Sequence, residues 1–411
     1  MNRNERVLLF LLAAINFTHI LDFMIMMPLG NYLMPYFHIS TQQFSLIVSS
    51  YSYAAFTSGI IAAFVIDNFD RKNSLLFGYT GFIIGTFLCG IAPNYQMLIA
   101  ARILAGLFGG LIGAQVLSIV ADTFTYEKRG RAMGYLMAAF SVASVVGVPI
   151  SLYIANGISW HAPFILVAIL GVILVPLTYK FLPQMKGHLQ KKSDRKPVHA
   201  FAIIFSRKSA LVALLLSACL MLGHFLIVPF INPFMEFNVG FTRNQIPLIY
   251  VAGGLATLVS APIFGRLSDK YGKLRIMVIC IFLSLPFIYL ITNMPRIPFY
   301  FVLIATAIWF VVSNGRSIAA QAMISNVIEP QYRGAFMSLN SSFQQLFVGS
   351  ASFIAGLIVT NDVVTKKIYN YNWVGFLSIA IVLLCVYLGL QLNKQMQATP
   401  VEKKREVVPN V

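Results

Sequence analysis

Long apolar stretches separated by short polar segments make up most of the chain. A helix needs about 20 apolar residues to cross a bilayer. The pattern predicts twelve such helices, at residues 7–34, 44–66, 75–92, 97–121, 132–155, 160–181, 210–236, 244–265, 275–293, 298–326, 334–360 and 373–392. We therefore expect an all-α membrane protein.

One polar, basic segment divides the twelve expected helices into two sets of six. It gives an N-terminal six-helix bundle at 1–181, a cytoplasmic linker at 182–209, a C-terminal six-helix bundle at 210–393 and a basic cytoplasmic tail at 394–411.

Composition supports the membrane class. Of the 411 residues, 58% are hydrophobic and 10% are charged, whereas soluble domains average about 45–50% and about 25%. The four cysteines lie in apolar runs without metal-ligand spacing, and the chain has no P-loop or hydrolase motif. We expect no enzyme activity, no cofactor and no metal.

The net charge of +17 is distributed unevenly. Of 30 Lys and Arg residues, 24 lie in segments on the side of the N-terminus, and only Arg243, Arg296, Lys366 and Lys367 lie on the other side. This bias predicts cytoplasmic termini. The positive charge thus reports topology rather than a nucleic-acid partner. We expect a multi-pass monomer in the cytoplasmic membrane of a bacterium, with the lipid bilayer as a partner.

The two halves repeat one plan. The segments Ala63-Phe-Val-Ile-Asp67-Asn-Phe-Asp70-Arg71 and Gly265-Arg-Leu-Ser-Asp269-Lys-Tyr-Gly272-Lys273 share an Asp-to-basic spacing at an offset of 202 residues. Two related halves are typical of transporters that bind substrate between them, near the middle of the membrane.

Several of these motifs resemble the major facilitator superfamily. The segment from Gly265 to Arg275, GRLSDKYGKLR, is similar to that family's loop signature; in the first copy Ala63 and Asp70 replace two glycines. The resemblance implies two pseudo-symmetric six-helix bundles.

Three further motifs resemble particular branches of that superfamily. The run from Leu98 through Arg102 to Gly110 resembles the fourth-helix motif of proton-coupled members. Gly147-Val-Pro149 resembles the fifth-helix motif of exporters. Asp22 with Pro28-Leu29 resembles the first-helix motif of drug:proton antiporters. The chain is most similar to the drug:proton antiporter and arabinose-efflux-permease branch.

Charges in the loop signatures are candidates for a network that holds the inner gate shut. Its expected members are Asp67, Arg71, Lys72, Asp122, Arg129, Arg131, Asp269, Lys273 and Arg333. The alternative is ordinary loop charge that only sets orientation.

Asp22 is the only one of 13 acidic residues expected deep in a span. It lies about 24 Å along the first helix from Arg6, at a depth that matches Arg102 in the fourth span. Because a carboxylate in apolar surroundings is costly when ionised, Asp22 is a candidate proton carrier. We expect it to pair with Arg102 when deprotonated; a static structural pair is the alternative.

His224 occupies the position of Asp22 in the second half, so we expect it to face the same central space and to take part in proton coupling. Arg316 lies in the tenth span, where substrate binding, anion recognition and structural pairing with carbonyls are all open. The expected substrate cavity comprises His19, Asn16, Tyr53, Gln115, Phe225, Asn232, Tyr250, Trp309, Asn314, Arg316, Gln321, Asn340, Gln344 and Gln345.

These features predict a secondary transporter that exports a small, partly apolar solute in exchange for protons. The alternatives are a sugar or metabolite porter, a proton-independent facilitator, or a non-transporting membrane receptor of the same fold.

Overall fold

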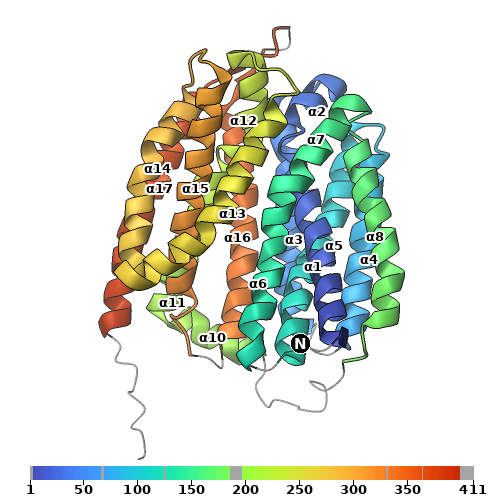
Figure 1. Ribbon diagram of the computed structural model, residues 1–411, viewed down its shortest axis with the longest axis vertical. Helices are drawn as coiled ribbons and strands as arrows, with labels where there is room; N and C mark the ends of the chain where they lie inside the picture. Colours follow the sequence, from blue (N-terminus) through green and yellow to red (C-terminus); the bar gives the residue numbers. More distant parts are fainter. Residues whose placement is uncertain are drawn as a thin grey trace, which may run out of the picture.

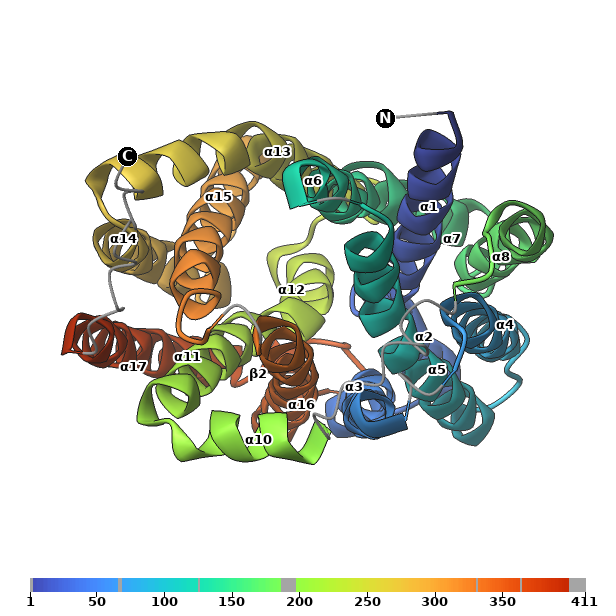
Figure 2. The same cartoon turned by 90° about the horizontal axis from the view of Figure 1, so that it is seen from below.

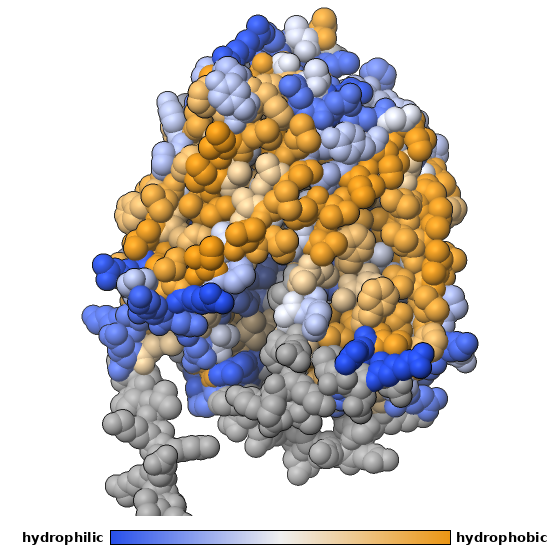
Figure 3. Space-filling view, in the orientation of Figure 1, coloured by the Kyte–Doolittle hydropathy of each residue, from blue (hydrophilic) through white to orange (hydrophobic). Residues whose placement is uncertain are grey.

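The computed structural model of the protein describes residues 3–65, 69–124, 126–185, 197–329, 332–362 and 364–398. Within these ranges, twelve helical stretches are long and apolar enough to cross a membrane. On the face shown in Figure 3, apolar residues cover the middle of the molecule, and hydrophilic residues gather toward both ends. The predicted all-helical membrane protein with twelve spans is confirmed.

The helices form two groups that lie side by side (Figure 1). The end of the molecule that carries the N-terminus is the predicted cytoplasmic end and is called the inner end; the opposite end is the outer end. The first group contains α1 (Arg3–Met26), α2 (Gly30–Phe37), α3 (Thr41–Val65), α4 (Arg71–Gly90), α5 (Tyr95–Thr123), α6 (Tyr126–Val142), α7 (Val148–Gly157) and α8 (Ala162–Phe181).

The second group follows the same course. It contains α10 (Pro197–Ser206), α11 (Lys208–Phe225), α12 (Val228–Phe234), α13 (Ile246–Tyr271), α14 (Lys273–Thr292), α15 (Phe299–Ile324), α16 (Arg333–Ile358) and α17 (Tyr371–Ala398). Seen from the inner end, α3 lies beside α16, and α6 beside α13, where the two groups meet (Figure 2).

Two of the expected continuous spans are broken, which corrects the sequence interpretation. The span at 7–34 is interrupted between Met26 and Gly30, next to Pro28, and the span at 210–236 between Phe225 and Val228, next to Pro229. Proline lacks an amide donor and clashes with the preceding helical turn, which favours a break there, although α8, α13 and α14 continue through Pro176, Pro262 and Pro286. The two breaks fall at matching places of the repeat.

The remaining differences are local. The expected fifth span contains a π-helical turn at Ala143–Gly147, between α6 and α7. Helix α10 lies within the segment interpreted as linker, and α17 runs to Ala398, past the expected end at 392. The short α10 escaped the sequence interpretation because it is too short to span a bilayer.

Several glycines lie at the contact between the two groups, and two of them approach backbone atoms of the other group. A Cβ atom at Gly356 of α16 would lie 3.1 Å from the carbonyl oxygen of Thr41 in α3. A Cβ atom at Gly254 of α13 would lie 3.0 Å from the Cα atom of Val145 in the π-helical turn. The groups therefore meet backbone to backbone toward the outer end.

A small hairpin follows α16 at the outer end. Its strands β1 (Thr360–Asn361) and β2 (Ile368–Tyr369) pair antiparallel. The Asp362 carboxylate accepts hydrogen bonds from the backbone N–H of Thr365 at 2.8 Å and of Val364 at 2.7 Å. These two donors stabilise the ionised carboxylate and lower the pKa of Asp362. The carboxylate is therefore charged at neutral pH and keeps both hydrogen bonds of the turn.

Candidate functional site

Asp22 of α1 and Arg102 of α5 form a buried ion pair. The Arg102 Nη1 atom donates to Asp22 Oδ2 at 2.8 Å, and the two side chains are 1% and 0% exposed. Helix α5 approaches α3 closely beside this pair, because a Cβ atom at Gly106 would lie 2.3 Å from the carbonyl oxygen of Tyr51. The structure thus places together the two residues that the depth argument matched; their part in proton coupling stays a prediction.

The surroundings of the pair satisfy it only in part. The Arg102 guanidinium lies over the ring of Tyr51, 4.3 Å from its centroid, a favourable cation–π contact. Within the described part of the chain, Asp22 Oδ1, Arg102 Nε and the Tyr51 hydroxyl have no hydrogen-bond partner. The Thr86 hydroxyl of α4 also lies close enough to interact with the Asp22 carboxylate, so a proton on Asp22 would change its contacts with both Arg102 and Thr86.

His224 occupies a different environment from the one expected. Its ring stacks on Trp309 of α15, with centroids 4.9 Å apart and an interplanar angle of 16°. The neighbouring Phe225 crosses to the first half, with its ring 5.9 Å from that of Phe23. The repeat predicted the depth of His224 in the membrane but not the direction of its side chain. Side chains one residue apart on a helix point in different directions, and it is Phe225, not His224, that makes the contact between the halves.

A cavity of about 420 Å³ lies in the second half between α11, α15 and α16. The predicted residues Gln321 and Gln344 line it, together with Ser217 and Ser317, which the sequence interpretation missed. Gln344 Nε2 donates to Ser217 Oγ at 2.7 Å. Single serines in apolar helices are common, so the sequence carried no signal for these two.

The other predicted cavity residues scatter. Asn16 donates to the carbonyl of Leu136 at 3.1 Å, and His19 packs edge-on against Phe82; both contacts lie inside the first half. Tyr53 reaches Ser350 across the contact between α3 and α16, at 3.4 Å. Among the predicted cavity residues, Gln115, Asn340 and Gln345 have amide atoms without a hydrogen-bond partner in the described part of the chain, and Asn314 is half-buried in α15.

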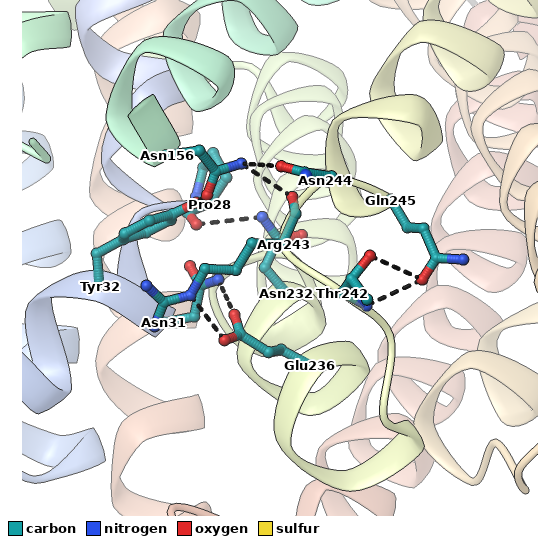
Figure 4. A network of polar contacts seen from close by, with 10 residues as sticks. All are labelled: Pro28, Asn31, Tyr32, Asn156, Asn232, Glu236, Thr242, Arg243, Asn244 and Gln245. Carbon is teal, nitrogen blue, oxygen red and sulfur yellow. Dashed lines mark hydrogen bonds and ion pairs between the residues drawn. The ribbon is translucent and has the colours of Figure 1, made fainter. Parts of the chain in front are cut away.

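Asn232 and Tyr250 belong to a polar network that closes the outer end (Figure 4). Asn232 donates to the carbonyl of Pro28 at 3.2 Å and accepts from the Tyr250 hydroxyl at 3.0 Å. Glu236 accepts from Asn31 of the first half and forms an ion pair with Arg243 at 2.9 Å.

The same network includes a second connection between the halves. Asn156 of α7 donates to the carbonyl of Arg243 at 3.1 Å and accepts from the hydroxyl of Tyr32, whose ring lies under the Arg243 guanidinium at 4.8 Å. The sequence interpretation did not include these residues. Asn31 and Asn232 each follow a proline by three residues, Pro28 and Pro229. This repeated spacing is a sequence signal that could have indicated the network.

The inner end shows no comparable closure in the described residues. The ion pairs among the described residues there, Arg71 with Asp122 at 3.1 Å and Arg207 with Glu329 at 2.6 Å, each join residues of one half. A hollow with hydrophilic residues lies between the halves toward this end (Figure 3). In the part of the chain that the structure describes, hydrogen bonds therefore join the halves at the outer end, and no ion pair joins them at the inner end.

The predicted gating network is only partly described. Asp67 lies outside the described residues, and Arg129 and Arg131 lie in α6 where side chains are not described. The remaining members sit at helix ends, and Lys72 lies over the ring of Tyr179 at 4.8 Å. Asp269, Lys273 and Arg333 form no ion pair with the residues that are described.

Known proteins of similar sequence are membrane transporters. The uncharacterized MFS-type transporter YceJ of Bacillus subtilis strain 168 is 24% identical over 337 residues, covering 82% of this chain and 85% of its own. Multidrug resistance protein 2 of the same organism is 24% identical over 363 residues, covering 84% of this chain and 86% of its own.

A solved structure shares the fold. A bacterial homolog of the human lysosomal transporter Spinster, in an inward-facing and occupied conformation, superposes with a TM-score of 0.76 at 12% identity, covering 97% of this chain and 98% of its own. The sequence profile of the Major Facilitator Superfamily matches residues 12–231 and 213–409. The chain therefore belongs to the Major Facilitator Superfamily, and it is a multi-pass membrane transporter of small molecules rather than an enzyme.

Proposed function

We propose that this transporter exports a small, partly apolar solute in exchange for protons, by alternating access in the cytoplasmic membrane of a bacterium. The observation that carries the proposal is the buried Asp22–Arg102 pair at 2.8 Å in α1 and α5. The similarity to multidrug resistance protein 2 of Bacillus subtilis supports the export direction.

The pair supplies the free energy that links a proton to a change of state. A proton on Asp22 removes the negative charge and frees Arg102 from its partner. Disrupting a buried pair changes stability by about 3–5 kcal/mol, and each 1.4 kcal/mol changes an equilibrium tenfold. Protonation of Asp22 shifts the balance between two conformations of the halves by as much as the Asp22–Arg102 pair differs in strength between them, and we propose that the pair is weaker in the other conformation.

The two ends supply the conformations. In this structure Asn31, Glu236 and Arg243 hold the outer end together, while the described inner end lacks ion pairs between the halves. The arrangement fits a state open to the predicted cytoplasmic side, in which a solute enters the region between α11, α15 and α16. Rocking of the halves about the α3–α16 contact would expose that region on the other side.

The test compares the wild type with Asp22→Asn in everted membrane vesicles. A panel of cationic, neutral and anionic radiolabelled solutes is screened for uptake driven by an imposed pH gradient. We expect the wild type to accumulate at least one solute, and we expect the accumulation to vanish in Asp22→Asn, while exchange of that solute without a gradient continues.

Glu329→Gln is the matched control, because Glu329 is an exposed acid whose side chain is 44% accessible. It should retain coupled uptake. Gradient-driven uptake that is unchanged in Asp22→Asn, or wild-type uptake that survives a protonophore, contradicts the proposal.

A further inference from the structure

The second half holds a buried cation without a carboxylate partner. Arg316 of α15 is 1% exposed. Its Nη1 atom donates to Ser284 Oγ at 3.2 Å, and its Nε atom has no partner in the described residues. The first half differs, because there Arg102 is paired with Asp22.

The sequence excludes a carboxylate from the centre of the second half. Between residues 209 and 392 the acidic residues are Glu236, Asp269, Glu329 and Asp362. All four lie at helix ends or in connections, outside the middle of any span. A buried guanidinium without an anion is costly in free energy. No acidic side chain of these helices lowers that cost for Arg316, whereas a bound anion would.

The groups around Arg316 are donors or weakly polar. His224 of α11 interacts electrostatically with Arg316, and its Nδ1 atom has no partner in the described part of the chain. The thiols of Cys280 in α14 and Cys385 in α17 also lie within electrostatic range. The stacked ring of Trp309 covers one face of His224. Arg316 and His224 thus offer two nitrogen donors from facing helices.

The cavity described above begins one helical turn from these donors. Leu220 lines it four residues before His224 in α11, and Ala320 lines it four residues after Arg316 in α15. Four residues span about one turn. Most of the lining is apolar, with polar groups at Ser217, Gln321 and Gln344. Its volume of about 420 Å³ falls in the range of small-molecule sites.

We propose that Arg316 and His224 bind the anionic head group of a small amphiphilic solute, a carboxylate above all, while the apolar part of the solute occupies the adjoining cavity. A guanidinium matches a carboxylate with two parallel hydrogen bonds. This inference rests on the proposed transport function. It adds the substrate class, which is amphiphilic monoanions.

The test uses the purified full-length protein in lipid nanodiscs with octanoate as the probe and octanamide as its uncharged counterpart. Binding is followed through tryptophan emission, because Trp309 stacks on His224. Trp160→Phe and Trp373→Phe in the background remove the other two tryptophans. We expect saturable octanoate binding and at least tenfold weaker octanamide binding.

The variants separate charge from structure. Arg316→Gln should weaken octanoate binding at least tenfold, equivalent to about 1.4 kcal/mol, and Arg316→Lys, which keeps the charge but loses the bidentate geometry, should weaken it less than Arg316→Gln does. His224→Gln gives a second reading if Arg316→Gln does not fold, and we expect it to weaken octanoate severalfold and leave octanamide unchanged. Arg207→Gln is the control, since Arg207 is a surface arginine of the same half.

Two results would overturn the proposal: equal binding of octanoate and octanamide, or octanoate binding that neither Arg316→Gln nor His224→Gln weakens. The outcome is separable from proton coupling. Selective octanoate binding in a protein that shows no gradient-driven transport would refute only the proposed function. Coupled transport with no preference for octanoate would refute only the anion site.

Discussion

Removing one member of the Asp22–Arg102 pair should destabilise the protein far more than removing both. The two side chains are 0% and 1% exposed and 2.8 Å apart, so either single change leaves a charge buried without its partner. Such a loss costs about 3–5 kcal/mol. With an unfolding entropy of about 2 cal/mol/K per residue, this corresponds to a fall in Tm of about 4–6 °C for a chain of this length.

The assay is thermal unfolding of Asp22→Asn, Arg102→Gln and the double variant, followed with a maleimide dye that fluoresces on reacting with thiols. All four cysteines are buried in the folded chain, so the dye reports the loss of helix packing. We expect the double variant to regain most of the Tm lost by either single variant, because the apolar surroundings then hold two neutral groups.

Arg207→Gln supplies the comparison. The N–O distance of the Arg207–Glu329 pair is even shorter, at 2.6 Å, but its side chains are 38% and 44% exposed. An exposed pair contributes at most about 1 kcal/mol to stability, so the Tm of Arg207→Gln should fall by about 1 °C or less. Single-variant losses that simply add in the double variant would refute the reasoning, because they would show that the two charges do not compensate each other.

Two further predictions concern helix contacts and the outer end. Gly106→Ala should destabilise the protein by about 1–3 kcal/mol, because the new Cβ atom would lie 2.3 Å from the backbone oxygen of Tyr51. Gly113→Ala is the control and should have a neutral or slightly stabilising effect, because no atom lies within 4 Å of its Cβ position. Equal Tm values of the two variants would contradict this prediction. Glu236→Gln removes the ion pair with Arg243, worth at most about 1 kcal/mol. It should speed hydrogen–deuterium exchange at the outer helix ends up to about fivefold, while unchanged exchange there would show that the pair does not hold the halves together.

Much of the fold follows from local properties of the chain. The length of each apolar run predicts a span because a helix must satisfy its own backbone hydrogen bonds in lipid. The offset of 202 residues between Asp67 and Asp269 indicated two related halves. Depth along two helices matched Asp22 with Arg102, since both distances scale with the same rise per residue.

The helix breaks and the scattered cavity residues did not follow in this way. Apolarity alone does not distinguish a continuous span from one interrupted beside Pro28 or Pro229, because bundles tolerate proline wherever neighbours satisfy the freed backbone groups. Depth and register also leave open which way a side chain faces. His224 lies at the expected level but contacts Trp309 in its own half.

The sequence by itself determined the twelve spans, the repeat and the chemical types of the intramembrane charges, because hydropathy and residue spacing do not depend on tertiary contacts. Depth along the helices matched Asp22 with Arg102, and the tertiary structure sets the two side chains 2.8 Å apart. Only the tertiary structure left Arg316 without a carboxylate partner among the described residues and joined Asn31 to Glu236 across the halves. Those contacts depend on how two rigid helical groups dock, and docking is set by side-chain packing between segments roughly 200 residues apart, which no local pattern encodes.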